Sequence, residues 1–151
     1  MPRERIVRTA ARAEELGFGE LWFSEDCFFT GAGAGITAAL AATHELPVGM
    51  GIVAAMTRHP ALLAMEIATI SRLYPGRLRA GVGLGVPAWL EQMGLMPASP
   101  LQALRECVVG VKRLLAGEEV TEHGSVFAFD HVELTHKPQE RIPMYMGLIN
   151  A

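Results

Sequence analysis

Apolar residues follow two different spacings along this chain. In some segments they recur about every three or four positions, which makes one face of a helix apolar; in others they form short continuous runs typical of buried strands. The helical spacing predicts helices at Arg3–Leu16, Ile36–Thr43, 58–74 and from Ser99 to Gly117. The apolar runs predict strands at Gly19–Phe23, Pro47–Val53, Leu78–Gly83 and Pro143–Leu148. Helices and strands alternate, which indicates an α/β fold with a parallel sheet.

The last third of the chain is expected to contain a long helix and a hairpin. Ser99 and Gln102 have the spacing of a capping box, in which two side chains bond free N–H groups of the first turn. The apolar stripe of this helix comprises Leu101, Leu104, Val108, Val111 and Leu115. Residues 120–134 predict a small hairpin that turns at 123–125 and has Phe127 and Phe129 on one face. The prolines at 87, 97 and 100 predict a loop before the helix.

Two predicted strands have closely spaced glycines near their ends. Residues 79–87 read Arg-Ala-Gly-Val-Gly-Leu-Gly-Val-Pro, and residues 47–53 read Pro-Val-Gly-Met-Gly-Ile-Val. Glycine lets a backbone approach another group closely, or turn without a Cβ in the way. The nearly continuous apolar character of residues 47–53 is typical of strands covered on both faces. We expect one ligand to lie across several strand ends.

Composition narrows the class of protein. Of the 151 residues, 50% are hydrophobic and 19% are charged, with a formal net charge of -3 at pH 7. An acidic chain without a basic run gives no reason to expect nucleic acid as a partner. The apolar stretches are shorter than the roughly 20 residues of a membrane-spanning helix, and the first residues lack the apolar core of a signal peptide.

Cysteine usage points to a reducing compartment. Cys27 and Cys107 make neither a disulfide framework nor a metal-ligand spacing. The histidines at 44, 123, 131 and 136 share no ligand spacing either, so we expect no metal site. We therefore expect a cytoplasmic protein with one domain over residues 1–151 and without a membrane partner.

Two architectures fit the alternation of helices and strands. In a doubly wound open sheet the glycines at 81, 83 and 85 would bind a dinucleotide, but Val86 stands where the G-x-G-x-x-G motif needs its third glycine. Pro87 lies in the same loop, and no strand with a terminal acidic residue comes about 20 residues later. The alternative is part of a (β/α)8 barrel, whose sites lie at the C-terminal ends of the strands and whose full length is about 250 residues. The pattern favours the barrel only slightly.

Six stretches resemble, in the same order, the bacterial-luciferase-like oxidoreductases. Ala13–Asp26 resembles the first helix and second strand of that family, and Pro47–Val53 with Arg58–Ala64 resembles its third strand and subsequent helix. Ile70–Gly85 is similar to the signature L-x-R-L-x-x-G-R-x-x-x-G-x-G. Leu114–Val120 and Pro143–Gly147 are similar to the next segments of the family. The resemblance covers nearly the whole chain.

The resemblance implies a fold and an activity. The fold would be a (β/α)8 TIM barrel, of which this chain supplies strands two to five. FMN or the deazaflavin coenzyme F420 would bind at the strand tips, next to a small organic substrate. The reaction would be hydride transfer or, in the oxygen-using members, monooxygenation. We expect hydride transfer to a C=C or C=N bond as the first subtype, because no acid–base pair is evident.

The resemblance also implies the cofactor-binding residues, which lie at the tips of the predicted strands. These are Asp26, Cys27, Gly51, Ile52, Val53, Ala54, Val82, Gly83 and Leu84. Gly51–Ile52 matches the position of a non-prolyl cis peptide in the family; an ordinary trans strand is the alternative. Many relatives have histidine where this chain has Cys27, so its proton-transfer role does not carry over. Some deazaflavin enzymes have a catalytic glutamate at the position of Leu84, so no catalytic residue is assigned.

Several other polar residues are expected to have structural roles. Arg58 and His59 would cap a helix and leave a charge on the surface, and Cys107 would lie in the core. Acidic side chains at 14, 15, 118 and 119 read as solvated surface. Asp26 is equally compatible with a cofactor contact and with capping of its own loop.

A second functional hypothesis remains beside the enzyme. Part of a barrel has two unpaired sheet edges and a large apolar face, which invite association with another copy. The chain would then be a non-catalytic fragment that persists as a homo-oligomer, with a dimer as the simplest form.

Overall fold

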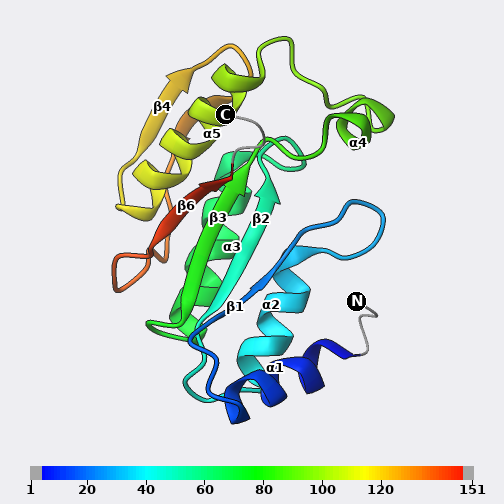
Figure 1. Cartoon of the computed structure of the whole chain (residues 1–151). Helices are drawn as coiled ribbons and strands as arrows, with labels where there is room; N and C mark the ends of the chain where they lie inside the picture. Colours follow the sequence, from blue (N-terminus) through cyan, green and yellow to red (C-terminus); the bar gives the residue numbers. More distant parts are fainter. Residues whose placement is uncertain (1–4, 148–151) are drawn as a thin grey trace.

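A four-stranded parallel sheet forms the centre of the protein (Figure 1). The structure is a computed structural model that describes residues 5–147. The sheet has the order β1-β2-β3-β6, with β1 (Leu21–Phe23), β2 (Val48–Ala54), β3 (Leu78–Gly83) and β6 (Met144–Gly147). The predicted α/β fold with a parallel sheet is confirmed. The expected ends of the first helix and last strand, Arg3 and Leu148, lie outside the described residues.

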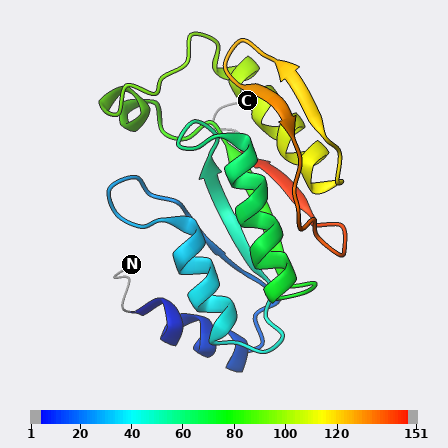
Figure 2. The same cartoon turned by 180° about the vertical axis from the view of Figure 1, so that it is seen from behind.

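Helices α2 (Ala32–Ala41) and α3 (Pro60–Leu73) cover one face of this sheet, as seen from behind in Figure 2. Val48 and Met50 of β2 are fully buried in the same core cluster as Leu63 and Ile67 of α3. Each such side chain contributes about 1.5–3 kcal/mol by leaving water. Helix α1 (Ile6–Glu15) packs against α2, with Ile6, Ala10 and Ala13 buried as the spacing predicts.

The other face of the sheet has no helix over it within residues 5–147 (Figure 1). The Trp22 indole lies against Gly49 and Gly51 of β2, and the Tyr145 ring packs against Trp22 with centroids 5.0 Å apart. Strand β2 is mostly buried, as its apolar sequence predicts, but on this face the Trp22 ring covers Gly49 and Gly51 and no helix of the described chain does so. Glycines at positions 49 and 51 leave room for a single large ring instead.

Helix α5 (Pro100–Leu115) and a hairpin form a second packing unit beside α3. The hairpin consists of β4 (Val120–His123) and β5 (Ala128–Val132), which pair antiparallel and confirm the predicted turn region. Phe127 and Phe129 are both buried, and their rings meet the His59 ring from the start of α3. The Glu106 carboxylate of α5 accepts hydrogen bonds from the backbone N–H groups of residues 125–127.

Some element predictions are wrong for identifiable reasons. Helix α2 begins at Ala32, not Ile36; Gly33 and Gly35, which the sequence placed in a loop, lie inside the helix and pack closely against Glu66 and Ile6. Pro87–Gln92 forms the short helix α4 in place of a loop, with Pro87 in its first turn and Leu90 buried. Leu101 is 76% exposed, so the buried stripe of α5 excludes it. The predicted capping box is absent: Ser99 makes no side-chain cap, and the Gln102 amide donates to the Glu106 carboxylate.

Glu14 and Arg77 fasten the opposite end of the sheet, where β2 begins. The Glu14 carboxylate accepts the N–H groups of His44, Glu45 and Leu46 at 2.8–3.0 Å. Arg77 donates to the Leu46 carbonyl at 3.1 and 3.2 Å. The hydrogen bonds from Glu45 and Leu46, and then that from His44, lower the pKa of Glu14 to about 2. The expectation of a solvated surface carboxylate is therefore wrong for Glu14.

Candidate functional site

A cavity of about 460 Å³ opens at the C-terminal ends of β1, β2 and β3. This volume lies in the range of about 300–1,000 Å³ that is usual for small-molecule sites. Six of the residues predicted from the sequence line it: Asp26, Cys27, Gly51, Ile52, Ala54 and Leu84. The strand tips therefore bring together residues that lie far apart in the chain, as the parallel order of the sheet requires.

Ile52 and the glycines around it form the floor of the cavity. The Gly51–Ile52 peptide bond is cis, as the resemblance implies. The Ile52 side chain lies over Gly81 and Gly83 of the adjacent strand β3 and over Gly147 of β6 beyond it. A Cβ at Gly147 would stand 2.7 Å from Ile52 Cδ1, closer than real side-chain contacts. These glycines therefore make room for Ile52.

Three predicted residues do not line the cavity with their side chains. Val53 and Val82 are fully buried in the core on the helix-covered face, and Gly83 is buried beneath Ile52. Any contact of Val53 or Val82 with a ligand would have to come from the backbone. Their assignment, like that of the other site residues, stays a prediction.

The loop after β1 holds Asp26 and Cys27 in a tight turn. The Asp26 carbonyl accepts the N–H groups of Phe29 and Thr30, both at 2.9 Å, and the Asp26 carboxylate accepts a hydrogen bond from the Ser24 hydroxyl at 3.0 Å. Burial raises the pKa of the Cys27 thiol, and the carboxylates of Glu25 and Asp26 raise it further. The thiol is thus protonated at neutral pH, which makes it a poor nucleophile.

Side chains that the sequence did not suggest complete the wall. Val86, Pro87 and Trp89 come from the start of α4, while Pro100, Leu101 and Leu104 come from α5. The signal for them was weak, because the sequence predicted a loop at α4. Among the residues that the structure describes, the charged members of the lining are Glu25 and Asp26. The cavity therefore presents an apolar surface with acidic groups on one side.

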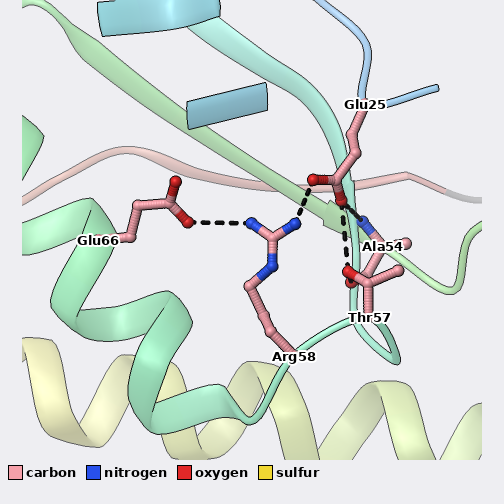
Figure 3. Close-up of polar contacts among 5 residues, drawn as sticks. All are labelled: Glu25, Ala54, Thr57, Arg58 and Glu66. Atoms are coloured by element: carbon pink, nitrogen blue, oxygen red, sulfur yellow. Dashed lines mark hydrogen bonds and ion pairs between the residues drawn. The ribbon is translucent and has the colours of Figure 1, made fainter. Parts of the chain in front are cut away.

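A polar network lies behind this wall and was also missed (Figure 3). We call it the Glu25 network; it comprises Glu25, Ala54, Thr57, Arg58 and Glu66. Arg58 forms ion pairs with Glu25 and, at 2.9 Å, with Glu66. The surface charge expected for Arg58 is therefore wrong, since its side chain is only 21% exposed. The sequence signal for this ion pair was that two opposite charges, Glu25 and Arg58, follow two adjacent predicted strands.

His59 and Cys107 have the structural roles that the sequence predicts. His59 is the N-cap of α3; its Nδ1 accepts the N–H of Ala61 at 3.1 Å, and its Nε2 lies 3.0 Å from the Ala128 carbonyl. Cys107 is fully buried in α5, and burial raises the pKa of its thiol to about 12. Within residues 5–147, no cluster of His, Cys, Asp or Glu could hold a metal ion, and no helix is long and apolar enough to cross a membrane.

Comparison with known proteins establishes the family. The sequence profile described as luciferase-like monooxygenase matches residues 1–150. The chain belongs to the luciferase-like monooxygenase family. A 5,10-methylenetetrahydromethanopterin reductase of Methanolobus tindarius is 28% identical over 146 residues, which are 97% of this chain and 44% of that relative. The family predicted from the sequence is thereby confirmed.

Solved luciferase-like structures confirm the fold. An F420-dependent secondary alcohol dehydrogenase, in complex with an F420-acetone adduct, superposes with a TM-score of 0.89 at 28% identity, over 97% of this chain and 48% of that one. The oxygenating constituent of a Pseudomonas putida diketocamphane monooxygenase, in complex with FMN, gives 0.84 at 19% identity, over 95% and 45%. The second likeness shows the fold alone. The chain spans about half the length of these TIM-barrel relatives, in agreement with the expected partial barrel.

Proposed function

We propose that this protein is an oxidoreductase of the luciferase-like type, with a deazaflavin or flavin ring seated in the strand-tip cavity. The observation that carries the proposal is this cavity of about 460 Å³, because its floor and most of its wall are apolar and it opens where barrel enzymes bind ligands. Coenzyme F420 is the preferred cofactor over FMN, since a solved structure of 28% identity and a relative of 29% identity are named for F420, whereas the structure in complex with FMN is 19% identical.

The lining suits a ring and not a phosphate. Ile52, Leu84 and Trp89 offer apolar surface to a planar group. Within the described part of the chain, the lining contains neither Lys nor Arg, the usual partners of phosphate. Bound there, the cofactor would supply hydride chemistry, while the chain's own residues orient the ring and exclude water from it. A small, uncharged organic substrate would occupy the remaining space.

Cofactor titration tests this proposal. We expect the fluorescence of coenzyme F420 to change saturably on addition of the purified protein, with FMN binding more weakly. Leu84→Trp places a bulky ring in the cavity and should weaken binding at least about tenfold, whereas Leu62→Trp on the exposed side of α3 should leave it unchanged. A wild-type protein that binds neither cofactor would contradict the proposal.

A non-catalytic oligomer is the second candidate, and the sheet edges favour it. Beside β6 lies a groove of about 1030 Å³, and beside β1 lies one of about 550 Å³ lined largely by α1. Tyr145 and Met146 of β6 are exposed. Such edges associate readily with further strands. We propose a homodimer in either case, and a single cytoplasmic domain in keeping with the two free cysteines.

A further inference from the structure

A buried carboxylate stands between the cavity and the helices. Glu25 is one of the lining residues, yet its side chain is only 7% exposed. Each of its carboxylate oxygens has a partner: Arg58 donates to Oε1, and the Ala54 N–H donates to Oε2 at 3.1 Å. Burial of a charge is costly unless such partners compensate it. The position of Glu25 is therefore closely specified.

Glu25 binds the tip of β2 through both its backbone and its side chain. Its N–H donates to the Ile52 carbonyl at 3.2 Å, and its carboxylate accepts from Ala54, two residues further on. Thr57 Oγ1 lies 2.9 Å from the Ala54 carbonyl and 3.4 Å from Glu25 Oε2. The hydroxyl has one proton, so it donates mainly to the nearer acceptor, the Ala54 carbonyl. The segment Ile52–Thr57 is thus held at several points.

Arg58 extends the network away from the cavity. Its other terminal nitrogen, Nη1, donates to the carboxylate of Glu66 in the middle of α3, as Figure 3 shows. The Glu66 carboxylate in turn lies against Gly33 of α2, where a Cβ would overlap it. The floor of the cavity is therefore tied to both helices that cover the far face of the sheet.

We propose that Glu25 is a positioning residue, which together with Arg58 holds the segment Ile52–Thr57 in the shape that the ring seat requires. This inference rests on the proposed function, because the ring is the group that this segment would contact. Glu25 acts through Ile52 and Ala54, which line the cavity beside it. The neighbouring acidic residue of the wall, Asp26, differs because its carboxylate bonds Ser24 of its own loop.

The variant Glu25→Gln removes one hydrogen-bond acceptor of the side chain while keeping its size. Glutamine has the same shape, but only one of its two terminal atoms can accept, so either Ala54 or Arg58 loses its partner. Glu14→Gln is the matched control, because Glu14 also accepts backbone N–H groups at both carboxylate oxygens, at the opposite end of β2. Both variants should unfold at lower urea concentration than the wild type.

Two measurements on each variant test the proposal. In Glu25→Gln we expect amide hydrogen exchange at Ala54 to accelerate at least about tenfold and the dissociation constant of coenzyme F420 to rise by about the same factor. Glu14→Gln should bind the cofactor as the wild type does, despite its lower stability. An unchanged dissociation constant in Glu25→Gln, or an equal rise in both variants, would overturn the positioning role.

Failure of the proposed function gives a different result. If the wild type binds neither coenzyme F420 nor FMN, the oxidoreductase proposal fails and the exchange measurement alone decides. Faster exchange across Ile52–Thr57 in Glu25→Gln, with wild-type exchange there in Glu14→Gln, supports Glu25 as the residue that holds this segment. Protection retained in both variants overturns it.

Discussion

At the scale of single residues, carboxylates that accept backbone N–H groups hold loops and strand ends in place. Glu14 binds the loop before β2, Glu25 binds the tip of β2, and Glu106 binds the turn of the hairpin. Burial raises the pKa of Glu106, but the hydrogen bonds from Gln102, Phe127 and Ser125 outweigh it and lower the pKa to about 2. Because their pKa values are lowered in the folded state, the carboxylates of Glu14 and Glu106 stabilise that state only while they are ionised.

Acid should destabilise the protein through Glu14 and Glu106. Their pKa values of about 2 lie below the ordinary value of 4.5, so the stabilisation is complete above about pH 4.5 and is lost as the pH falls toward 2. We expect the urea midpoint of the wild type to fall between about pH 5 and about pH 2.5, since the unfolded chain takes up protons there first. Urea titrations monitored by circular dichroism measure this.

The double variant Glu14→Gln with Glu106→Gln is the control for the acid effect. It should be less stable than the wild type at neutral pH and should lose less stability on acidification, because its amides do not titrate. A double variant with the same pH dependence as the wild type would show that other groups govern acid unfolding.

Sequence reasoning could not assign these carboxylates, because their partners lie far away in the chain. Glu14 binds residues about 30 positions later, and Glu25 binds residues in the next strand unit. An acidic residue on a helix has no local feature that distinguishes such a role from a solvated surface. The strand tips at Gly51 and Leu84 could be predicted from the sequence, because the glycine-rich strand ends and their order along the chain match the family.

At the scale of elements, the contact between α5 and the hairpin depends on one glycine. Gly110 lies in the middle of α5 and is buried, and a Cβ there would stand 2.6 Å from Cζ of Phe129. The Phe129 ring is 4% exposed and also meets His59, with centroids 4.9 Å apart, so it has little room to move. The glycine thus sets how closely helix and hairpin approach.

Gly110→Ala should destabilise the protein although alanine favours helices. The gain in helix propensity is about 1 kcal/mol, while overpacking a tight contact costs about 1–3 kcal/mol. We expect a net loss of about 1 kcal/mol in the free energy of unfolding, measured with urea. Adding Phe129→Leu to Gly110→Ala should make the alanine less costly than it is alone, whereas a single variant more stable than the wild type would contradict the clash.

Elements with strong periodicity were predictable, and those set by packing were not. The run of Leu63, Ile67 and Ile70 gives α3, and all three are buried. Helix α2 begins earlier than expected, and Gly33 and Gly35 inside it serve tertiary contacts. Leu101 fits the helical spacing but faces the open cavity, where only the fold can place it.

At the scale of the whole molecule, the sheet has two edges within the described residues. β1 and β6 each pair with a strand on one side only, as far as the described part of the chain extends. The groove beside β6 and the exposed side chains of Tyr145 and Met146 support the proposal that this edge associates with a second copy. The same proposal follows from the sequence, because its predicted strands make up only part of a barrel.

Light scattering after size exclusion should therefore give twice the chain mass of 16.3 kDa. Met146→Lys places a charge on the exposed edge strand and should shift the protein to a monomer. Leu62→Lys, at an exposed position of α3, should leave the dimer intact. A wild type that elutes as a monomer at all concentrations would contradict dimerisation.

The glycine floor beneath Ile52 decides where this site can be redesigned. Backbone atoms and one isoleucine fill the space between the strands, so a larger residue at position 81, 83 or 147 would displace Ile52 and deform the sheet. The rim consists of side chains from α4 and α5, among them Val86, Trp89 and Leu104. Altered ligand preference is therefore to be sought by engineering the rim, while the floor is kept constant.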